Sequence, residues 1–255
     1  DKMGFLSFKK TKFIFGDKLK KVLSSKNINK RIKENFVFSN KSLFTLFTSG
    51  STGTPKGIIH STGGYLLYAK LTCMKQFGLT QNKTILCASD AGWINGHTYS
   101  LFGPLSIGAT TVLLEKPVGI IDNTFLETII NENKLSILYL PVTLIRILKS
   151  ILGEKKISLK HKISALGSMG EPLAKDVAKW YSDKFSDSKL SIVNTYFQTE
   201  TCGIISSPKY NSKPPKNYHG TVGKTVNKNI KIKLKNNELV ITTPWPGSMI
   251  GVING

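Results

Sequence analysis

The protein has 255 residues, of which 40% are hydrophobic, and this is enough for one large domain or two small ones. No apolar run approaches the ~20 residues of a transmembrane helix, and the charged start is not followed by the apolar core of a signal peptide. The three cysteines lack the spacing of a metal site or a disulfide framework, so we expect a reducing compartment, the cytoplasm, with the nucleus left open.

The formal net charge of +21 raises the question of a nucleic-acid partner. Of the 36 basic residues only Arg31 and Arg146 are arginines, whereas proteins that read phosphates or bases usually employ the planar arginine fork. The lysines are scattered and interleaved with asparagine and isoleucine. We therefore favour a solvated basic surface over a specific nucleic-acid site, and the sequence leaves the oligomeric state open.

From residue 42 onward, short apolar runs alternate with longer amphipathic ones, a pattern that predicts an α/β fold with a largely parallel sheet covered by helices. One of the helices begins at Asp122 as its N-cap and presents Phe125, Ile129 and Ile130 on one face. The expected elements, in chain order, are strand 43–48, helix 65–77, strand 84–88, helix 99–107 broken at Gly103-Pro104, strand 110–114, helix 122–132, strand 136–140, helix 142–152, strand 162–166, helix 173–185 and strand 190–196.

The composition divides the chain into three parts. Residues 1–40 are lysine-rich and weakly patterned, and we leave them unassigned. Residues 41–207 carry the α/β pattern. Prolines then mark a connector, and 208–255 are typical of the start of a β-rich subdomain, with a hairpin expected from strands 230–234 and 238–243.

Ligands of parallel sheets bind at the carboxyl ends of the strands, so the loops that follow strands are the candidates for a site. The loop FTSGSTGTPKG at 47–57 is rich in glycine and hydroxyl groups, which favours phosphate binding over a plain flexible loop. It is not the mononucleotide phosphate loop, because Pro55 stands where the second glycine should be and Gly57, not Ser or Thr, follows Lys56. The other loops of interest are 89–97, 167–172 and 196–203.

Residues 48–57 resemble the signature [ST]-S-G-[ST]-T-G-x-P-K-G of the adenylate-forming enzymes: acyl-CoA synthetases, luciferases and the adenylation domains of peptide synthetases. The resemblance covers about 42–255, and its G-W-x-x-G-H, G-S-x-G-E-P and Q-T-E-T versions are most similar to those of acetyl-CoA synthetase. The further matching stretches, in the order of that family, are AGWINGH at 91–97, GSMGEP at 167–172, YFQTET at 196–201, GTVGK at 220–224 and WPG at 245–247.

The resemblance implies a two-step reaction. A carboxylate, acetate or another short-chain acid, attacks the α-phosphate of ATP to give an acyl-adenylate, and coenzyme A then displaces AMP. Propionate or a somewhat longer acid, another acyl acceptor, and a non-catalytic nucleotide-binding relative are the alternatives. A basic nucleic-acid binder is a further one, and it would show steeply salt-dependent binding.

By resemblance, the catalytic residues are Lys56, Thr199 and Glu200. Thr199 contacts phosphate, and Glu200 supplies the hard carboxylate that a magnesium ion bridging the phosphates requires. The alternative for Glu200 is an ordinary surface acid. The phosphate-binding residues implied by the resemblance are Thr48, Ser49, Gly50, Ser51, Thr52, Gly53, Thr54 and Lys56.

In the adenine site implied by the resemblance, glycine lets the backbone approach the flat base closely, and the Tyr196 ring stacks on the base. Tyr196 could instead be a core aromatic. The family usually has aspartate where this chain has Asn194, a change that removes a charge. The residues of the implied adenine and AMP site are Gly170, Glu171, Pro172, Asn194, Thr195, Tyr196, Phe197, Gln198 and Thr199.

The acyl pocket implied by the resemblance departs from the acetate-specific pattern. Phe197 stands where acetate enzymes have tryptophan, so the pocket could admit a methylene or more. Asn95 stands where threonine is usual, at a position that also touches coenzyme A. The other walls would be Trp93, Ile94 and Met169, for which ordinary core packing is the alternative.

Two family elements have no match before Gly255: the aspartate that binds ribose and the lysine of a small C-terminal lid domain. We therefore expect a piece of a longer protein that, alone, binds adenylate weakly and turns over poorly. Among the histidines, His97 could orient its loop, His161 looks like a surface residue, and His60 and His219 are as readily structural as functional.

Overall fold

The computed structural model describes residues 36–48, 53–114, 123–186, 191–213 and 220–254. The chain divides into two compact units, Asp1–Val37 and Phe38–Gly255, and the elements below all belong to the second. In the described part of the chain, no helix is long and apolar enough to cross a membrane.

A five-stranded parallel sheet forms the centre of this unit, in the order β4-β3-β5-β6-β7. The expected α/β class with a largely parallel sheet is therefore confirmed. The strands are β3 (Thr84–Cys87), β4 (Thr110–Val112), β5 (Leu135–Pro141), β6 (Ala165–Met169) and β7 (Val193–Asn194).

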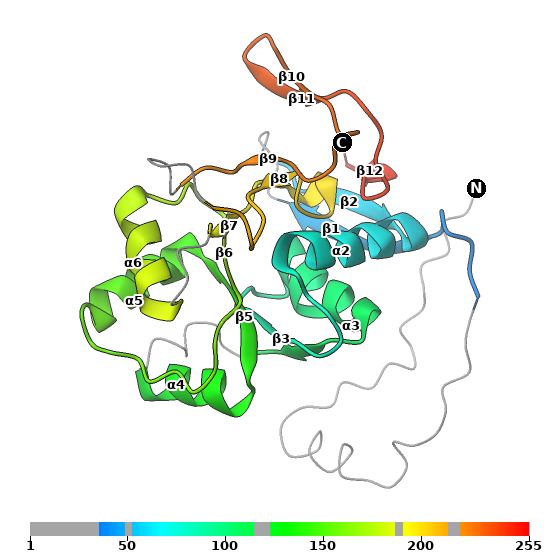
Figure 1. Cartoon of the computed structure of the whole chain (residues 1–255). Coiled ribbons are helices and arrows are strands. Elements are labelled where there is room, and N and C mark those ends of the chain that lie inside the picture. The colour runs from blue at the N-terminus through cyan, green and yellow to red at the C-terminus, as the bar shows by residue number, and fades with distance from the viewer. Residues whose placement is uncertain (1–35, 49–52, 115–122, 187–190, 214–219, 255) are drawn as a thin grey trace, which may run out of the picture. The chain divides into compact units, whose positions relative to one another are not determined.

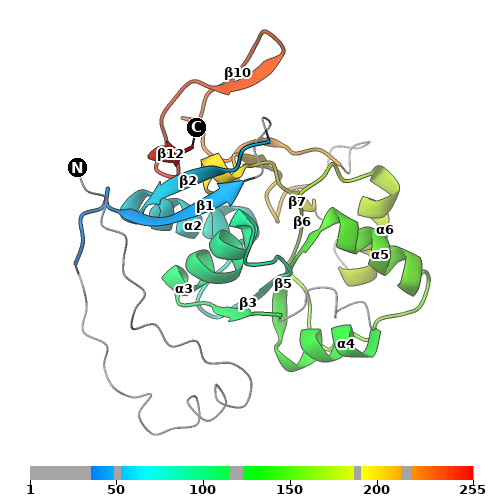
Figure 2. The ribbon, with the colours of Figure 1, turned by 180° about the vertical axis from the view of Figure 1, so that it is seen from behind.

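Side chains that alternate along β3 and β5 bury both faces of the sheet. Ile85 and Tyr139 belong to one core cluster, with residues from α2 and η2. Leu86 and Leu138 belong to another, with residues from α4, α5 and α6, and Figures 1 and 2 show these two helix groups on opposite sides of the sheet. The helices are α2 (Thr62–Phe77), the π-helix η2 (Gly96–Phe102), α3 (Gly103–Ile107), α4 (Asn123–Glu132), α5 (Val142–Leu152) and α6 (Lys175–Phe185).

Some expected elements were misplaced. The expected strands 162–166 and 190–196 are β6 at 165–169 and the two-residue β7 at 193–194, because pairing with the neighbouring strand, not local pattern, sets their ends. The buried face of α4 is Leu126, Ile129 and Ile130, and Phe125 is 45% exposed. The expected cap Asp122 lies outside the described residues.

The first strand does not join the parallel sheet, contrary to expectation. β1 (Ser42–Thr48) pairs antiparallel with β2 (Lys56–Ser61), a strand that we did not predict. β12 (Gly251–Ile253) adds to the other edge of β2. The glycine-rich loop therefore connects two strands of a separate three-stranded sheet.

The expected hairpin near the C-terminus is confirmed as β10 (Ile232–Lys235) paired with β11 (Glu238–Ile241). Its two-residue turn consists of Asn236 and Asn237, which have positive φ angles of 49° and 62°. Asparagine tolerates this left-handed conformation better than most residues, and two such residues are typical of a tight hairpin turn. A second small pair is formed by β8 (Ser206–Ser207) and β9 (Lys224–Thr225).

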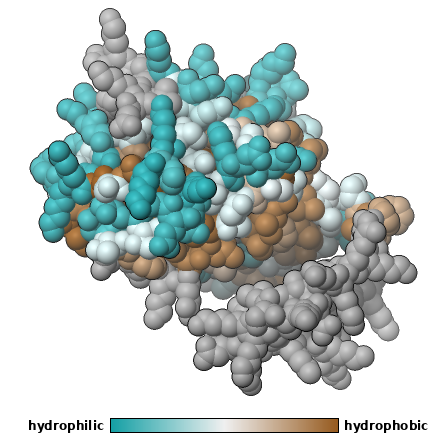
Figure 3. All heavy atoms as spheres, turned by 60° about the horizontal axis from the view of Figure 1, so that its bottom comes forward, coloured by the Kyte–Doolittle hydropathy of each residue, from teal (hydrophilic) through white to brown (hydrophobic). Residues whose placement is uncertain are grey.

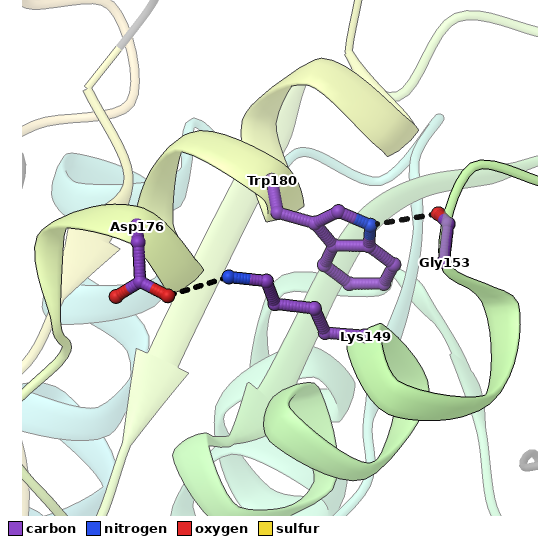
Figure 4. A network of polar contacts seen from close by, with 4 residues as sticks. All are labelled: Lys149, Gly153, Asp176 and Trp180. Atoms are coloured by element: carbon purple, nitrogen blue, oxygen red, sulfur yellow. Dashed lines mark hydrogen bonds and ion pairs between the residues drawn. The ribbon is translucent and has the colours of Figure 1, made fainter.

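Helices α5 and α6 are joined at the surface by polar contacts (Figure 4). The Lys149 ammonium group on α5 forms an ion pair with Asp176 on α6, and it holds the pKa of that carboxyl below its ordinary value. The Trp180 indole donates a hydrogen bond of 3.0 Å to the carbonyl of Gly153. On the face drawn in Figure 3, hydrophilic side chains cover wide areas, with apolar patches between them.

Candidate active site

A cleft of about 810 Å³ opens beside the carboxyl ends of β6 and β7. Segments that are far apart in the sequence line it, and four of the motif-bearing loops contribute. The predicted site residues that line the cleft are Thr48, Trp93, Ile94, Asn95, Gly170, Glu171, Pro172, Thr195, Tyr196, Phe197, Gln198, Thr199 and Glu200.

The remaining predicted site residues that the structure describes are not brought into the lining. Met169 is 2% exposed and Asn194 is 1% exposed, and both lie behind the cleft surface. The described phosphate-loop residues Gly53, Thr54 and Lys56 also lie outside the lining. The other four predicted phosphate-loop residues, Ser49, Gly50, Ser51 and Thr52, lie outside the described residues.

The segment after β6 turns sharply into the cleft. Gly170 has a φ of 90°, a conformation that side-chain-bearing residues rarely adopt, so glycine suits this position. The Arg146 guanidinium group donates to the Glu171 carboxylate over 2.8 Å. Because both side chains are substantially exposed, this ion pair contributes little to stability, but it orients Glu171 at the cleft wall.

The end of β7 is fixed by side-chain hydrogen bonds. The Asn194 amide oxygen accepts a hydrogen bond from the Ser168 hydroxyl over 2.9 Å, and its amide nitrogen donates to the carbonyl of Gly220 over 2.8 Å. The Thr195 hydroxyl donates to the Ser168 carbonyl over 2.9 Å. Asn194 therefore holds Gly220, which lines the cleft, and acts behind the surface.

The 3₁₀ turn η4 (Thr199–Thr201) carries the two predicted catalytic residues that line the cleft. Gln198 caps the turn, and its backbone N–H donates to the Thr201 hydroxyl over 3.0 Å. Three successive carbonyl groups of the turn accept hydrogen bonds from distant segments. The donors are His60 Nε2 to Thr199 at 2.7 Å, the Met249 N–H to Glu200 at 3.0 Å, and Trp245 Nε1 to Thr201 at 3.4 Å.

Aromatic residues form the apolar part of the cleft. The ring of Phe197 meets the ring of Tyr99 edge to face, with their centroids 5.6 Å apart. Trp93 is 68% exposed and lines the cleft, so core packing does not describe it. Met169, by contrast, packs in the core cluster that contains Tyr139.

Burial sets the protonation of the groups behind the cleft. It lowers the pKa of His60 and raises the pKa of Cys87 to about 12. The Nε2 of His60 must carry its proton, because the Thr199 carbonyl can only accept. The Nδ1 of His60 is buried and has no hydrogen-bond partner among the described residues.

Two glutamates line the cleft; Glu171 forms an ion pair with Arg146, so Glu200 is the better candidate for holding a magnesium ion. It is partly buried in the cleft wall next to Thr199. Among the described residues, no group of three or more His, Cys, Asp and Glu side chains is placed to hold a metal. Magnesium is commonly held by one or two carboxylates together with substrate phosphates and water, so a single carboxylate fits this ion.

A larger cleft of about 950 Å³ borders α5 and α6, and none of the predicted site residues that the structure describes lines it. It is lined by surface lysines such as Lys156, Lys160 and Lys179, together with Trp180 and Phe185. Its volume exceeds that of the smaller cleft, but the described residues of its lining include no glycine and none of the motif residues, and its polar side chains are mostly lysines, with Glu154, Asp183 and Ser186. The smaller cleft is therefore the better candidate site.

The sequence interpretation missed the residues that fasten η4 from behind. The position of His60 just beyond the phosphate loop is a weak indication of a role near the site. Nothing in the neighbouring sequence identifies Thr199 as its partner. Trp245 lies in the WPG stretch, but its contact with Thr201 could not be inferred from a motif. These contacts join segments that are more than 40 residues apart in the sequence.

Comparison with protein families matches residues 8–249 to the AMP-binding enzymes, so the match starts well before residue 42, where the motifs begin. Acetyl-coenzyme A synthetase of Psychromonas ingrahamii is 44% identical over 168 residues, which cover 65% of this chain and 26% of that protein. Acetyl-coenzyme A synthetase of Photobacterium profundum is 38% identical over 220 residues, covering 81% of this chain and 33% of that protein.

Acetyl-coenzyme A synthetase 1 of Pseudomonas aeruginosa is 38% identical over 217 residues, covering 80% of this chain and 33% of that protein. The matches thus span only a quarter to a third of the length of these curated relatives. The family match, in contrast, extends over nearly all of this chain, from residue 8 to residue 249. The chain therefore belongs to the family of AMP-binding enzymes.

Proposed function

We propose that this chain is the nucleotide- and acid-binding part of an AMP-forming ligase of the acetyl-CoA synthetase type. The observation that carries the proposal is the convergence of four motif loops on one cleft beside the carboxyl ends of β6 and β7. The similarity to acetyl-coenzyme A synthetases supports the same activity. The substrates would be ATP, a short-chain carboxylate and coenzyme A.

The proposed reaction has two balanced steps. A carboxylate oxygen of the acid attacks the α-phosphorus of ATP, and the bond to the β-phosphate oxygen breaks, which releases pyrophosphate. The sulfur of coenzyme A then attacks the acyl carbon, its proton is lost, and AMP leaves with the bonding electron pair. Both steps leave negative charge on phosphate oxygens, so the protein must supply fixed positive and hydrogen-bonding groups.

Each wall of the cleft would serve one part of the substrates. The adenine would lie between the Gly170–Pro172 segment and the ring of Tyr196, and Trp93 and Phe197 would enclose the acid. Asn95 would face both the acid and coenzyme A. The backbone and hydroxyl groups of the glycine-rich loop, with Lys56, would bind the β- and γ-phosphates.

Glu200 would hold a magnesium ion, and Thr199 would donate to a phosphate oxygen. When bound, the ion would neutralise charge that builds up on the phosphates. The Glu200 carboxylate would determine the position of the ion and thus which phosphate oxygens are neutralised. Its turn is held at three successive carbonyl groups, so it is suited to this role.

The domain assignment remains part of the proposal: an unassigned segment at 1–40, the adenylation subdomain at 41–207, and a connector with a partial β-rich subdomain at 208–255. A separate lid domain would complete the site. We also propose a cytoplasmic location, in keeping with free small-molecule substrates. No specific nucleic-acid partner is proposed.

The test is acid-dependent exchange of labelled pyrophosphate into ATP, on the protein expressed from its complete reading frame. Acetate, propionate, butyrate and octanoate are compared, with residues 1–255 alone in parallel. Exchange that peaks at acetate or propionate supports the proposal, and weak exchange by 1–255 alone supports a separate lid. ATP binding without exchange for any acid would favour a non-catalytic nucleotide-binding relative, for which Asn194 in place of the usual aspartate is the supporting observation.

A further inference from the structure

His60 connects the strand after the phosphate loop to the turn that carries Glu200. It lies near the end of β2, which begins at Lys56, and its side chain is fully buried. Its Nε2 donates to the Thr199 carbonyl over 2.7 Å. One strand therefore links the predicted phosphate-binding lysine to the residue that precedes the predicted metal-binding carboxylate.

The ring of His60 is held in place by its neighbours. Its centroid lies 5.5 Å from that of Phe44 and 5.3 Å from that of Tyr65. Phe44 also stacks on His97 of the loop at 91–97, with centroids 5.1 Å apart. Packing on these sides leaves Nδ1 buried without a partner among the described residues, so the ring keeps a single polar contact, the one to Thr199.

This contact differs from those of the next two carbonyl groups. The Glu200 and Thr201 carbonyls accept from Met249 and Trp245, which belong to the C-terminal segment of the described chain. Of these three bonds, only that of His60 comes from the strand that leaves the phosphate loop. It joins the turn directly to β2, whereas the C-terminal segment reaches β2 through the Ile250 N–H bond to the Ile59 carbonyl.

We propose that His60 is a positioning residue that holds the Thr199–Glu200 turn against β2, the strand that begins at Lys56. Its functional consequence rests on the proposed function, because the groups that it aligns are those expected to bind the magnesium-bound triphosphate. Loss of the donor would loosen the turn and weaken the alignment of Glu200 with the phosphates. ATP without magnesium would be affected little.

The experiment uses the protein expressed from its complete reading frame and three variants. His60→Phe keeps a ring but removes the donor, and His60→Gln keeps an amide that can donate to Thr199. His161→Phe, at an exposed histidine outside the cleft lining, is the matched control. Amide hydrogen exchange is measured for 198–205, with β5 at 135–141 as the internal reference.

For His60→Phe we expect about tenfold faster exchange in 198–205 and an unchanged rate in the reference, since loss of a partly buried hydrogen bond changes the opening equilibrium by about one decade. Calorimetry should show that the ratio of ATP affinity with magnesium to that without it is several-fold smaller in His60→Phe than in the parent. His60→Gln should keep most of the parent's protection from exchange in 198–205 and most of its magnesium dependence of ATP affinity. His161→Phe should match the parent in both.

Unchanged exchange in 198–205 for His60→Phe would overturn the inference. So would a loosened turn with an unchanged magnesium dependence of ATP affinity, because the bond would then be merely structural. A parent protein without acid-dependent pyrophosphate exchange would overturn the proposed function instead. In that case the hydrogen-exchange comparison still decides whether His60 holds the turn.

Discussion

The ring of Phe197 packs edge to face on the ring of Tyr99, with their centroids 5.6 Å apart. Tyr99 is fully buried, and its hydroxyl accepts a hydrogen bond of 2.8 Å from the Ile204 N–H. Phe197, which lines the cleft, is thus supported by a residue that is bonded to the segment following η4. A change of ring size at Phe197 should alter the space for the acid without moving its support.

We predict that Phe197→Trp shifts acid selectivity toward acetate. The larger indole fills the space of a methylene, and one methylene of fit is worth ~1–3 kcal/mol, or ~10-fold or more in relative rate. Pyrophosphate exchange with acetate, propionate and butyrate measures this as a ratio. Phe125→Trp, on the exposed part of α4, is the control and should leave the ratios unchanged. An unchanged propionate-to-acetate ratio in Phe197→Trp would exclude Phe197 as the acyl-size determinant.

Glu200→Gln should reduce the exchange rate by ~10²-fold, the usual loss when one group that stabilises transition-state charge is removed. The amide keeps the shape of the side chain but removes the charge that magnesium requires. The magnesium concentration for half-maximal exchange should rise. Glu154→Gln, in the larger lysine-lined cleft, is the matched control and should behave like the parent. A full rate for Glu200→Gln at low magnesium would contradict the assignment.

Local sequence was sufficient where local chemistry decides the structure. The turn of Asn236 and Asn237 is one example, because two adjacent asparagines favour the positive φ angles of a tight hairpin. The helix at 142–152 is another: its apolar residues recur at helical spacing, and α5 has the expected ends. The motifs likewise indicated which loops would meet, and most of the predicted site residues that the structure describes line one cleft.

Local sequence failed where partners far along the chain decide. Nothing near β1 indicates that it pairs with β2 rather than with the parallel sheet, because both choices bury the same alternating side chains. The sequence motifs also do not distinguish residues that line the cleft from residues that lie behind its surface. Asn194 belongs to a matching motif, yet its amide is turned to Ser168 and Gly220.

The hydrogen bonds of Asn194 predict that Asn194→Asp, which restores the aspartate usual in the family, lowers the free energy of unfolding. In Asn194→Asp the carboxylate cannot donate to the Gly220 carbonyl, and two oxygens would then face each other in a buried site. We expect a loss of ~1–3 kcal/mol in the free energy of unfolding, measured by urea titration at pH 7. Asn211→Asp, at an exposed position, is the control and should change stability by less than ~0.5 kcal/mol. Equal stability of parent and Asn194→Asp would show that the donor is not required.

The three cysteines predict a loss of stability at alkaline pH. All are buried and free; burial raises the pKa of Cys87 to about 12, and it also raises the pKa values of Cys73 and Cys202 well above the ordinary thiol value. A thiol in the unfolded chain ionises near ~8.5. Above that pH the unfolded state releases protons that the folded state keeps, so the free energy of unfolding falls as pH rises.

The stabilising contribution of the thiols is therefore complete below pH ~8.5 and is lost above it, by ~1.4 kcal/mol per pH unit for each thiol that ionises on unfolding. Urea unfolding with a reductant present, at intervals from pH 7 to 10, measures this slope. Folded protein at pH 8 should also react slowly with a thiol reagent and unfolded protein quickly, because the thiolate is the reactive form. A free energy of unfolding that is constant or rises between pH 8.5 and 10 would contradict the assigned burial of the thiols.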